Sequence, residues 1–314
     1  MSALPSIALL IPAYNAAEFL PRLLRSAHSQ TEPFDEIWVY DDCSTDETAA
    51  VAEQYGARVL RGDVNRGCSA GKDTLARRVE AHWLHFHDAD DELLPNFVSL
   101  ARKWISGDCP DVVLFDYEYR EEETGELLLR RNFDSVQLRF DPRSYAIREQ
   151  INPFCGLYRR STFLTAGGYR DPPEMLYNED VACHIRLAFA GLSFGAESEV
   201  SIINYRRGDS MSAANQLKCL QSHFAVMRHT LGHPDAGPYR NDIAMKLWGV
   251  AGALAAYDDW ECADSAIKMA AQICPPPPSV GSLMFRAVAR IQPKLALRMR
   301  ELWIRAAKPH LRAR

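Results

Sequence analysis

The chain has 314 residues, of which 47% are hydrophobic and 25% charged, and these proportions are those of a globular protein with a sizeable core. Its formal net charge of -5 is unevenly distributed, because residues 281–314 hold nine Lys or Arg and a single acid, Glu301. The first 280 residues therefore carry 27 bases and 40 acids, a net charge of -13. This acidic body argues against nucleic acid as a partner, since a phosphate backbone needs a basic face.

The cysteines and the apolar runs disfavour two further classes of protein. The eight cysteines are scattered without a CxxC pair, which predicts reduced, partly buried thiols and neither a disulfide framework nor a zinc site. The first 15 residues lack a basic residue and have only a short apolar run, so we expect a first strand and no signal peptide. The longest later apolar stretch, residues 247–257, is too short to span a bilayer. A cytoplasmic location is the default expectation.

Strand and helix patterns alternate over the first 116 residues. Continuous or alternating apolar runs predict strands at residues 6–11, 36–40, 57–60, 82–87 and 112–116. Apolar residues at helical spacing predict helices at 19–27, after a capping box at 44–47, at 69–81 and at 95–106. This alternation predicts an α/β fold with a mostly parallel sheet flanked by helices. Such sheets bind ligands beyond the carboxyl ends of their strands.

The remainder of the chain changes character. Alternating residues around Thr124-Gly125 predict a hairpin, and residues 217–272 are predicted to be helical throughout. Within them, residues 247–274 have the pattern of one tetratricopeptide-type helical hairpin, although a single copy is a weak signal. Prolines at 275–278 predict a stiff break. We therefore expect a C-terminal all-helical extension.

Acidic residues follow two of the predicted strands. The second strand ends in Asp41 and Asp42, and the fourth is followed by Asp88, Asp90 and Asp91. Acids at such positions can simply solvate a turn or cap the next helix. That interpretation is weaker for Asp88 and Asp90, because an Asp-x-Asp at the ligand-binding edge of a parallel sheet concentrates negative charge where hard cations bind.

Four motifs occur in chain order, each at the end of a predicted strand or the start of a helix. They are Ile11-Pro-Ala-Tyr-Asn15, Asp41-Asp-Cys-Ser-Thr-Asp46, Asn65-Arg-Gly67 and Asp88-Ala-Asp-Asp91. Together they resemble the nucleotide-binding half of the family 2 glycosyltransferases, which have the GT-A fold. The acceptor half of that family is matched by Gly167-Gly-Tyr169, Glu179-Asp180, Tyr205-Arg206 and Ser210-Met-Ser212. The resemblance covers roughly residues 5–213.

The resemblance implies a metal-dependent, hexosyltransferase-type enzyme that inverts the anomeric carbon. The donor would be a nucleotide-diphosphate sugar, with a UDP-sugar expected, and the acceptor a saccharide or a lipid-linked molecule in bacterial surface polysaccharide synthesis. By position, Pro12 and Tyr14 would line the base pocket, Asp42 would accept the imino hydrogen of the base, and Asp88 would contact the ribose. Asp90 would bind the divalent cation, Mn²⁺ or Mg²⁺, that bridges the diphosphate. Tyr14 could instead be an ordinary core tyrosine.

Glu179 and Asp180 match the position of the catalytic acids in the resembled family. We expect Asp180 to be the general base that removes the proton of the acceptor hydroxyl, and Glu179 to contact acceptor hydroxyls or orient the loop. The alternative is that both acids merely favour a helix N-terminus.

Two departures from the family pattern leave local detail open. Gly71-Lys72-Asp73 stands where the family usually has Ala-Arg-Asn, so Lys72 offers the diphosphate a point charge while Asp73 adds a negative one. The run that follows Tyr205 also lacks a His that many relatives have. Without this His, the ligands of the metal would have to be completed differently, or Arg206 or Arg207 would contact the diphosphate. An equal alternative is that the two arginines are simply solvated at the surface.

Competing functions are weakened by missing motifs. No GxGxxG follows a strand and no GxxxxGK[ST] or GxSxG occurs, which disfavours a dinucleotide enzyme, a P-loop kinase and a serine hydrolase. A nucleotidyltransferase is disfavoured as well, because it would need a glycine-rich basic loop after the first strand and this chain has none there. The remaining alternative is a catalytically degenerate sugar-nucleotide-binding module that acts in an assembly complex.

The chain is predicted to contain three regions. Residues 1–213 would form the glycosyltransferase domain, with 5–116 as its nucleotide-sugar-binding half and 117–213 as its acceptor half. Residues 214–274 would form a helical subdomain, and 275–314 a proline-rich break with a basic amphipathic tail.

In the tail, apolar residues recur at three- or four-residue steps among the bases: Phe285, Val288, Ile291, Leu295, Met299, Leu302 and Trp303. One interpretation is a helix lying on an anionic membrane, which would place the protein at the inner face of the cell membrane. The other is a helix that packs this stripe on the rest of the protein and leaves its bases in solvent. Pro293 would kink the helix in either case.

Overall fold

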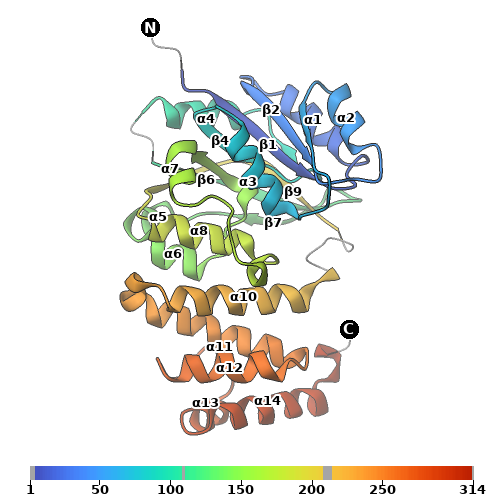
Figure 1. Cartoon of the computed structure of the whole chain (residues 1–314). Helices are drawn as coiled ribbons and strands as arrows, with labels where there is room; N and C mark the ends of the chain where they lie inside the picture. Colours follow the sequence, from blue (N-terminus) through green and yellow to red (C-terminus); the bar gives the residue numbers. More distant parts are fainter. Residues whose placement is uncertain (1–3, 108–109, 208–213, 313–314) are drawn as a thin grey trace. The chain divides into compact units, whose positions relative to one another are not determined.

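The computed structural model describes residues 4–107, 110–207 and 214–312 (Figure 1). The chain divides into two compact units, each of which is described by itself. Unit 1 comprises Met1–Tyr145, Ile151–Asp171 and Arg186–Ser210, and unit 2 comprises Ala146–Gln150, Pro172–Ile185 and Met211–Arg314. The division predicted at residue 213 stays a prediction; it differs from these units because two internal segments group with the C-terminal helices.

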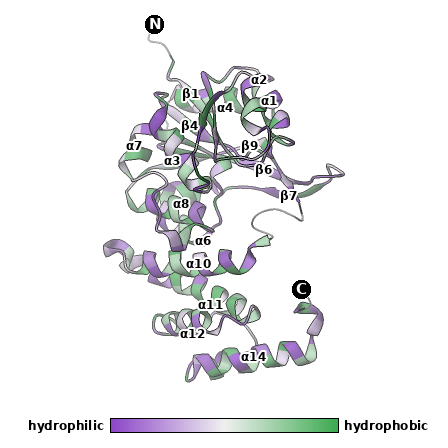
Figure 2. Cartoon of the chain, turned by 45° about the vertical axis from the view of Figure 1, so that its right-hand side comes forward, coloured by the Kyte–Doolittle hydropathy of each residue, from purple (hydrophilic) through white to green (hydrophobic). Residues whose placement is uncertain are grey.

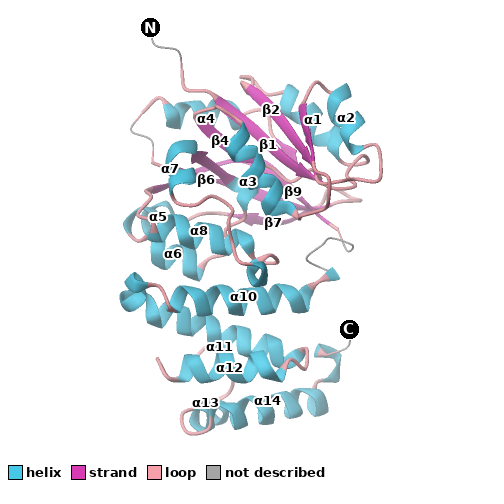
Figure 3. Ribbon diagram, in the orientation of Figure 1, coloured by secondary structure: helices cyan, strands magenta, loops and turns pink. Residues whose placement is uncertain are grey.

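Unit 1 is built on one mixed sheet (Figure 3). Its strands are β1 (Ile7–Ala13), β2 (Glu36–Asp41), β3 (Arg58–Arg61), β4 (Trp83–Phe86), β5 (Glu92–Leu93), β6 (Val112–Glu121), β7 (Leu127–Arg131), β8 (Gly156–Arg159) and β9 (Phe194–Arg206). Their order is β3-β2-β1-β4-β8-β6-β9-β5, with β7 paired to β6. All of β1 is buried, as its continuous apolar run predicts.

Strands β3, β2, β1 and β4 pair in parallel, as the alternation of strands and helices predicts. From β4 onward the pairs β4–β8, β6–β8, β6–β7 and β5–β9 are antiparallel, and β6–β9 is parallel. The expectation of a mostly parallel sheet thus describes the first four strands, and the remainder is mixed. The hairpin predicted around Thr124-Gly125 is confirmed, with Gly125 at a φ of 70° in the connection between β6 and β7.

Helices follow the strands of unit 1 as predicted. They are α1 (Leu20–His28), α2 (Thr48–Gln54), α3 (Cys68–Arg78), α4 (Phe97–Ile105), α5 (Ser135–Phe140) and α7 (Arg160–Thr165). Two more, α6 (Pro142–Arg148) and α8 (Glu179–Phe189), have residues in both units. The predicted capping box at 44–47 is wrong, because the Ser44 hydroxyl accepts a hydrogen bond from the Asn15 N–H instead of from the first turn of α2.

Unit 2 is mainly helical, as the predicted extension requires. Its helices are α10 (Gln216–Leu231), α11 (Arg240–Ala256), α12 (Trp260–Ala271), α13 (Leu283–Ala289) and α14 (Pro293–Ala307). The continuous helix expected over 217–272 is interrupted by a 3₁₀ segment, Pro234–Tyr239, and by a turn in which Asp258 has a φ of 61°. The α11–α12 pair forms the predicted helical hairpin.

Pro293 starts a helix instead of kinking one. Helix α13 ends at Ala289 and α14 begins at Pro293, so the predicted kink is wrong. The reason is that the first turn of a helix leaves its N–H groups unbonded, and proline at that position removes no hydrogen bond. Among the residues that the structure describes, no helix has the length and apolarity needed to cross a bilayer.

Candidate active site

The loops after β1 and β2 are joined by hydrogen bonds. The Asn15 N–H donates to Ser44 Oγ at 3.0 Å, and the Thr45 N–H donates to Asn15 Oδ1 at 2.8 Å. Asn15 adopts a φ of 48°, a left-handed conformation that asparagine tolerates better than most residues. Tyr14, beside it, is 50% exposed, which excludes the alternative that it is a core tyrosine.

Asp42 is buried and holds the loop that precedes α3. Its Oδ1 accepts from the Arg66 N–H at 2.9 Å, and its Oδ2 accepts from the Gly67 N–H at 2.7 Å. Gly67 has a φ of 85°, a conformation that disfavours a side chain. The motif after β2 and the Asn65-Arg-Gly67 motif therefore meet through this carboxylate. It has lone pairs to spare, since an ionised carboxylate offers about four acceptor sites.

The first turns of α3 account for the departure at Gly71. A Cβ at Gly71 would lie 2.8 Å from Tyr40 Cδ1 and 3.2 Å from Pro12 Cβ. Alanine would therefore collide with the Tyr40 ring. Pro12 itself is buried in β1 beneath this helix.

The two residues after Gly71 turn toward protein groups. Lys72 is only 2% exposed, and its Nζ lies 5.1 Å from the centroid of the Tyr169 ring. Asp73 accepts from Arg77 Nε at 2.8 Å and forms a second ion pair with Arg170 at 3.5 Å. The extra negative charge is thus offset by two guanidinium groups of the same unit.

The acidic loop after β4 is anchored to the end of β9. Asp91 is fully buried and accepts from Asn204 Nδ2 at 2.6 Å and from the Tyr205 N–H at 3.0 Å. Burial, with the negative charges of Asp90 and Asp88 as smaller causes, raises the pKa of Asp91 well above its ordinary value. Asp91 is therefore an internal anchor, whereas Asp88 and Asp90 are only partly buried.

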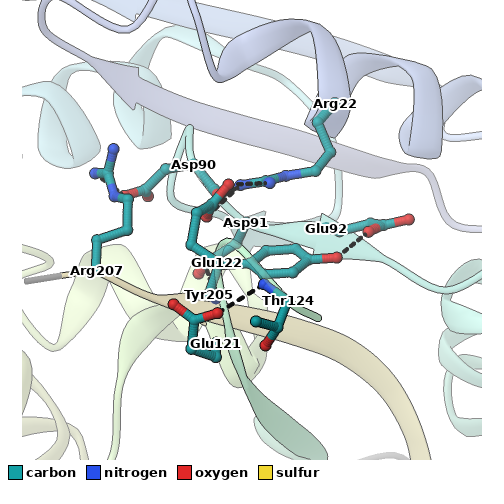
Figure 4. Close-up of polar contacts among 9 residues, drawn as sticks. All are labelled: Arg22, Asp90, Asp91, Glu92, Glu121, Glu122, Thr124, Tyr205 and Arg207. Carbon is teal, nitrogen blue, oxygen red and sulfur yellow. Dashed lines mark hydrogen bonds and ion pairs between the residues drawn. The ribbon is translucent and has the colours of Figure 1, made fainter. Parts of the chain in front are cut away.

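Two arginines contact Asp90 (Figure 4). Arg207 Nη2 donates to Asp90 Oδ2 at 2.6 Å, and its guanidinium lies 4.0 Å from the centroid of the Phe19 ring. Arg22 donates to the main-chain oxygen of Asp90 and pairs with Glu122 at 2.6 Å. The carboxylate proposed for a cation therefore has a guanidinium beside it.

Arg22 also lies over Tyr205, with its Cζ 3.9 Å from the ring centroid. The Tyr205 hydroxyl donates to Glu92 Oε2 at 2.8 Å, which ties the start of β5 to β9 (Figure 4). Burial and this carboxylate raise the pKa of Tyr205 to about 12. Sequence reasoning missed Arg22 and Glu122, which lie 100 residues apart and belong to no motif.

The carboxylates fit a divalent cation that takes most of its ligands from water and substrate. Within the described residues, no group of three or more His, Cys, Asp or Glu side chains is placed to hold a metal ion. Mg²⁺ and Mn²⁺, however, often use only one or two protein carboxylates and take their other ligands from water and substrate phosphates. Asp90, with 31% of its side chain exposed, fits a cation that arrives with a diphosphate.

Glu179 and Asp180 open α8 and belong to unit 2. Glu179 is buried, and its charge adds to burial in raising the pKa of the Cys219 thiol. Asp180 is less buried, and its main-chain oxygen accepts from His184 Nδ1 at 2.7 Å. The other predicted site residues lie in unit 1, so each set is described within its own unit. Ser210-Met-Ser212 lies outside the described residues.

The chain matches the profile of the family described as "Glycosyl transferase family 2" over residues 8–166. The putative teichuronic acid biosynthesis glycosyltransferase TuaG of Bacillus subtilis is 28% identical over 93 residues, which are 28% of this chain and 37% of that protein. Three curated relatives are each matched over only 31%, 37% and 37% of their own length.

Two solved structures share the fold over almost the whole chain. One is S. aureus TarS 1-349 in complex with UDP-GlcNAc, with a TM-score of 0.65, 14% identity and coverage of 96% of this chain and 92% of that one. The other is the mannosyltransferase PcManGT from Pyrobaculum calidifontis in complex with GDP-Man and Mn²⁺, with a TM-score of 0.60, 17% identity and coverage of 96% and 88%. At these identities the likeness establishes the fold, a GT-A α/β fold with a helical C-terminal region.

Proposed function

Because the chain belongs to glycosyl transferase family 2, we propose that it is an inverting, metal-dependent glycosyltransferase that moves a hexose from a nucleotide-diphosphate sugar to a saccharide or lipid-linked acceptor. The observation that carries this proposal is the grouping in unit 1 of four strand-end motifs. Strands β1, β2 and β4 are parallel neighbours, and the segments that contain Tyr14, Asp42 and Asp88 follow their carboxyl ends. That edge of a parallel sheet is where nucleotides bind.

The donor is proposed to be a UDP-sugar. The exposed ring of Tyr14 is free to stack on a base, and Pro12 is proposed to line the same base pocket. Asp42 accepts the base imino hydrogen with a remaining lone pair, and Asp88 contacts the ribose. The TarS structure contains UDP-GlcNAc and the PcManGT structure contains GDP-Man, so both kinds of base occur among proteins of this fold.

Asp90 is proposed to hold a divalent cation, Mn²⁺ or Mg²⁺, together with the donor diphosphate. When bound, the cation stabilises the negative charge of the departing nucleoside diphosphate. Arg207 competes with the cation for the Asp90 carboxylate, and once displaced its guanidinium can contact the diphosphate. Lys72 lies near the start of α3 but is buried over Tyr169. It can therefore act on the diphosphate only as a long-range charge.

Asp180 is proposed as the general base. Its carboxylate takes the proton of the acceptor hydroxyl while that oxygen attacks the anomeric carbon on the face opposite the diphosphate. The bond between the anomeric carbon and the diphosphate oxygen breaks, and the configuration inverts. Greater accessibility supports Asp180 for this role, whereas the buried Glu179 is better placed to orient the loop or an acceptor hydroxyl.

The biological setting is also a proposal. TuaG is named for teichuronic acid biosynthesis, and two further relatives are named as a succinoglycan biosynthesis protein and a chondroitin synthase. These names support surface polysaccharide synthesis as the context. A cytoplasmic location, at the inner face of the membrane through residues 281–314, belongs to the same proposal.

The second candidate is a degenerate sugar-nucleotide-binding module that recruits partners. The Arg207–Asp90 ion pair and the burial of Lys72 favour it, because both reduce the charge that the site offers a metal diphosphate.

Two measurements, made in sequence, separate the enzyme from the binding module. Thermal shift with UDP-sugars and Mn²⁺ identifies a ligand, since a ligand that binds the native state raises Tm by mass action. Release of UDP from that donor is then measured with Mn²⁺ and with EDTA. Release that requires Mn²⁺ supports the enzyme, and binding without any release supports the module.

A further inference from the structure

The outward face of α14 is apolar. The helix packs on α11 and α12 through a face that includes the buried residues Ala296, Leu297 and Ile304. Successive residues of a helix are turned by about 100°, so the exposed side chains of Leu295, Met299 and Leu302 lie on the opposite face, and the exposed Trp303 lies at its edge. These four apolar side chains are called the outer stripe below.

The outer stripe is left uncovered within unit 2. Leu302 is 69% and Trp303 57% exposed, so the helices of this unit do not cover them. The residues that do pack are a different set on the other side of the helix. Single exposed leucines are common, whereas a continuous apolar row on a helix otherwise bounded by bases indicates a contact surface.

From these observations we propose that α14 docks in the interfacial plane of an anionic lipid bilayer through the outer stripe. Figure 2 shows that hydrophilic and hydrophobic residues alternate along this helix. An amphipathic helix of this kind inserts apolar side chains at the boundary of headgroups and acyl chains while its bases stay at the headgroups.

Charge supports an anionic surface as the occupant. Residues 281–314, called the segment here, contain a single acid, Glu301, which is 1% exposed. Its carboxylate accepts from Arg305 at 3.0 Å and from Arg312 at 2.7 Å. Lys294 and Arg298 share one carboxylate, that of Asp264, at 3.6 and 3.1 Å. The surface of the segment therefore keeps a positive excess next to its apolar row.

The same charge argues against a second copy of the chain as the occupant. Two copies that met through the outer stripe would place like charges opposite each other, which is unfavourable at an interface. Trp303 adds a further indication, because Lys308 Nζ lies 5.4 Å over its ring. An aromatic ring beside a long basic side chain is typical of residues at a membrane–water interface.

The inference concerns unit 2 alone and does not depend on the proposed transfer reaction. The full chain is mixed with phosphatidylcholine vesicles, with or without phosphatidylglycerol, and sedimented. We expect sedimentation with the phosphatidylglycerol vesicles and much less with phosphatidylcholine alone. Raised salt weakens the binding because it screens the attraction.

Two matched variants identify the face. Leu295→Glu with Leu302→Glu should lower the partition onto anionic vesicles by at least about tenfold, since two apolar side chains are lost from the boundary. Val136→Glu with Phe140→Glu is the control, because these residues of α5 are 75% and 90% exposed in unit 1 and lie outside the outer stripe. The control should sediment as the wild type does. Thermal unfolding checks that both variants fold.

A second readout follows Trp303 itself. Brominated acyl chains quench tryptophans that reach the bilayer, so the fluorescence of the wild type should fall with anionic brominated vesicles. Trp303→Phe should remove most of that loss of fluorescence while the protein still sediments.

The proposal is overturned if the wild type does not sediment with anionic vesicles, or if the double glutamate variant binds as well as the control. A dimer in solution that the double glutamate variant disrupts, without vesicle binding, would instead assign the face to a second copy. Donor turnover in solution should be unchanged in the double glutamate variant, which separates this inference from the proposed function.

Discussion

Arg207 neutralises the carboxylate of Asp90 from the end of β9: its Nη2 donates to Oδ2 at 2.6 Å while its guanidinium rests 4.0 Å from the Phe19 ring centroid. The two residues lie 117 positions apart, and the acidic loop is tied to the same strand end by Asp91. We therefore expect a cation that binds Asp90 to compete with Arg207 for this carboxylate.

Arg207→Gln should strengthen the binding of Mn²⁺ in the absence of donor. The reason is that the competing guanidinium is gone, and a partly exposed ion pair of this kind contributes up to about 1 kcal/mol, or about fivefold in affinity. Electron paramagnetic resonance of free Mn²⁺ during a titration measures the change directly.

The neighbouring arginine supplies the control. Arg206 is adjacent to Arg207 in the chain and carries the same charge, but it lies over the Tyr119 ring, with its Cζ 3.9 Å from the centroid. Arg206→Gln should leave Mn²⁺ affinity unchanged. An equal effect of the two substitutions, or weaker Mn²⁺ binding by Arg207→Gln, would show that Arg207 does not compete for Asp90.

Asp90→Asn should abolish transfer and leave the fold intact. An amide is a poor ligand for a hard cation, so the charge of the leaving diphosphate loses its partner, and turnover should fall by at least about 10²-fold. The exposed acid Asp235 gives the control, since Asp235→Asn removes the same charge from unit 2. Near-normal turnover of Asp90→Asn, or wild-type turnover that EDTA does not change, contradicts the metal assignment.

Asp180→Asn should lose turnover and keep its affinity for the donor. A general base contributes typically about 10²–10⁴-fold, and it acts on the acceptor proton rather than on the nucleotide. Glu179→Gln should mainly raise the KM for the acceptor. Steady-state kinetics with both substrates, together with thermal shift by UDP, distinguish the two variants. Exchanged phenotypes would make Glu179 the base, and full activity of Asp180→Asn would remove the pair from the mechanism.

The parallel part of the sheet and the positions of its strand-end motifs could be predicted because both are local. A fully apolar run such as β1 has few alternatives to a buried strand, and an acid after a strand necessarily lies at the edge of the sheet. The hairpin at Gly125 was predictable for the same reason, since the turn residue and the alternating strands are adjacent.

Contacts between distant segments could not be predicted from one sequence. Ser44 has the spacing of a capping residue, yet its hydroxyl bonds to Asn15 of another loop, because tertiary contacts override a local preference. Arg22 has the appearance of an ordinary exposed helix base, and only the fold brings it to Glu122 and Asp90. The outer stripe was visible as a periodicity, but which side of α14 would pack depended on the neighbouring helices.

Asp42→Ala should lower both stability and donor affinity. Removing this buried carboxylate leaves the Arg66 N–H without its acceptor and the Gly67 N–H with only a longer bond to Asn65 Oδ1, which costs about 1–3 kcal/mol in the free energy of unfolding. Thermal denaturation and a UDP titration measure the two effects. Asp63→Ala, at an exposed acid near the same loop, is the control. A fully stable Asp42→Ala protein would mean that the loop keeps its conformation without this anchor.

Stability should fall with acid because of a buried histidine pair, His85 in β4 and His87 just after it. His85 is fully buried, its Nδ1 donates to the Gly156 oxygen at 2.9 Å, and its Nε2 lies 3.0 Å from His87 Nδ1. Burial lowers the pKa of His85 to about 3. Since the unfolded state takes up a proton below about pH 6.5 and the native state does not, the free energy of unfolding decreases as the pH falls from about 6.5 toward 3. His87, with a pKa also lowered by burial, adds to the decrease.

His85→Gln tests this assignment. Between about pH 7.5 and 5.5 the single histidine should account for a loss of about 1.4 kcal/mol, and chemical denaturation at the two pH values should show that much less pH dependence in the variant. Phe34→Leu is the control, because Phe34 stacks on His85 at 6.4 Å without titrating. The loss of stability of Phe34→Leu relative to the wild type should be the same at both pH values. Unchanged pH dependence in His85→Gln would mean that the native protein admits a proton to this pair.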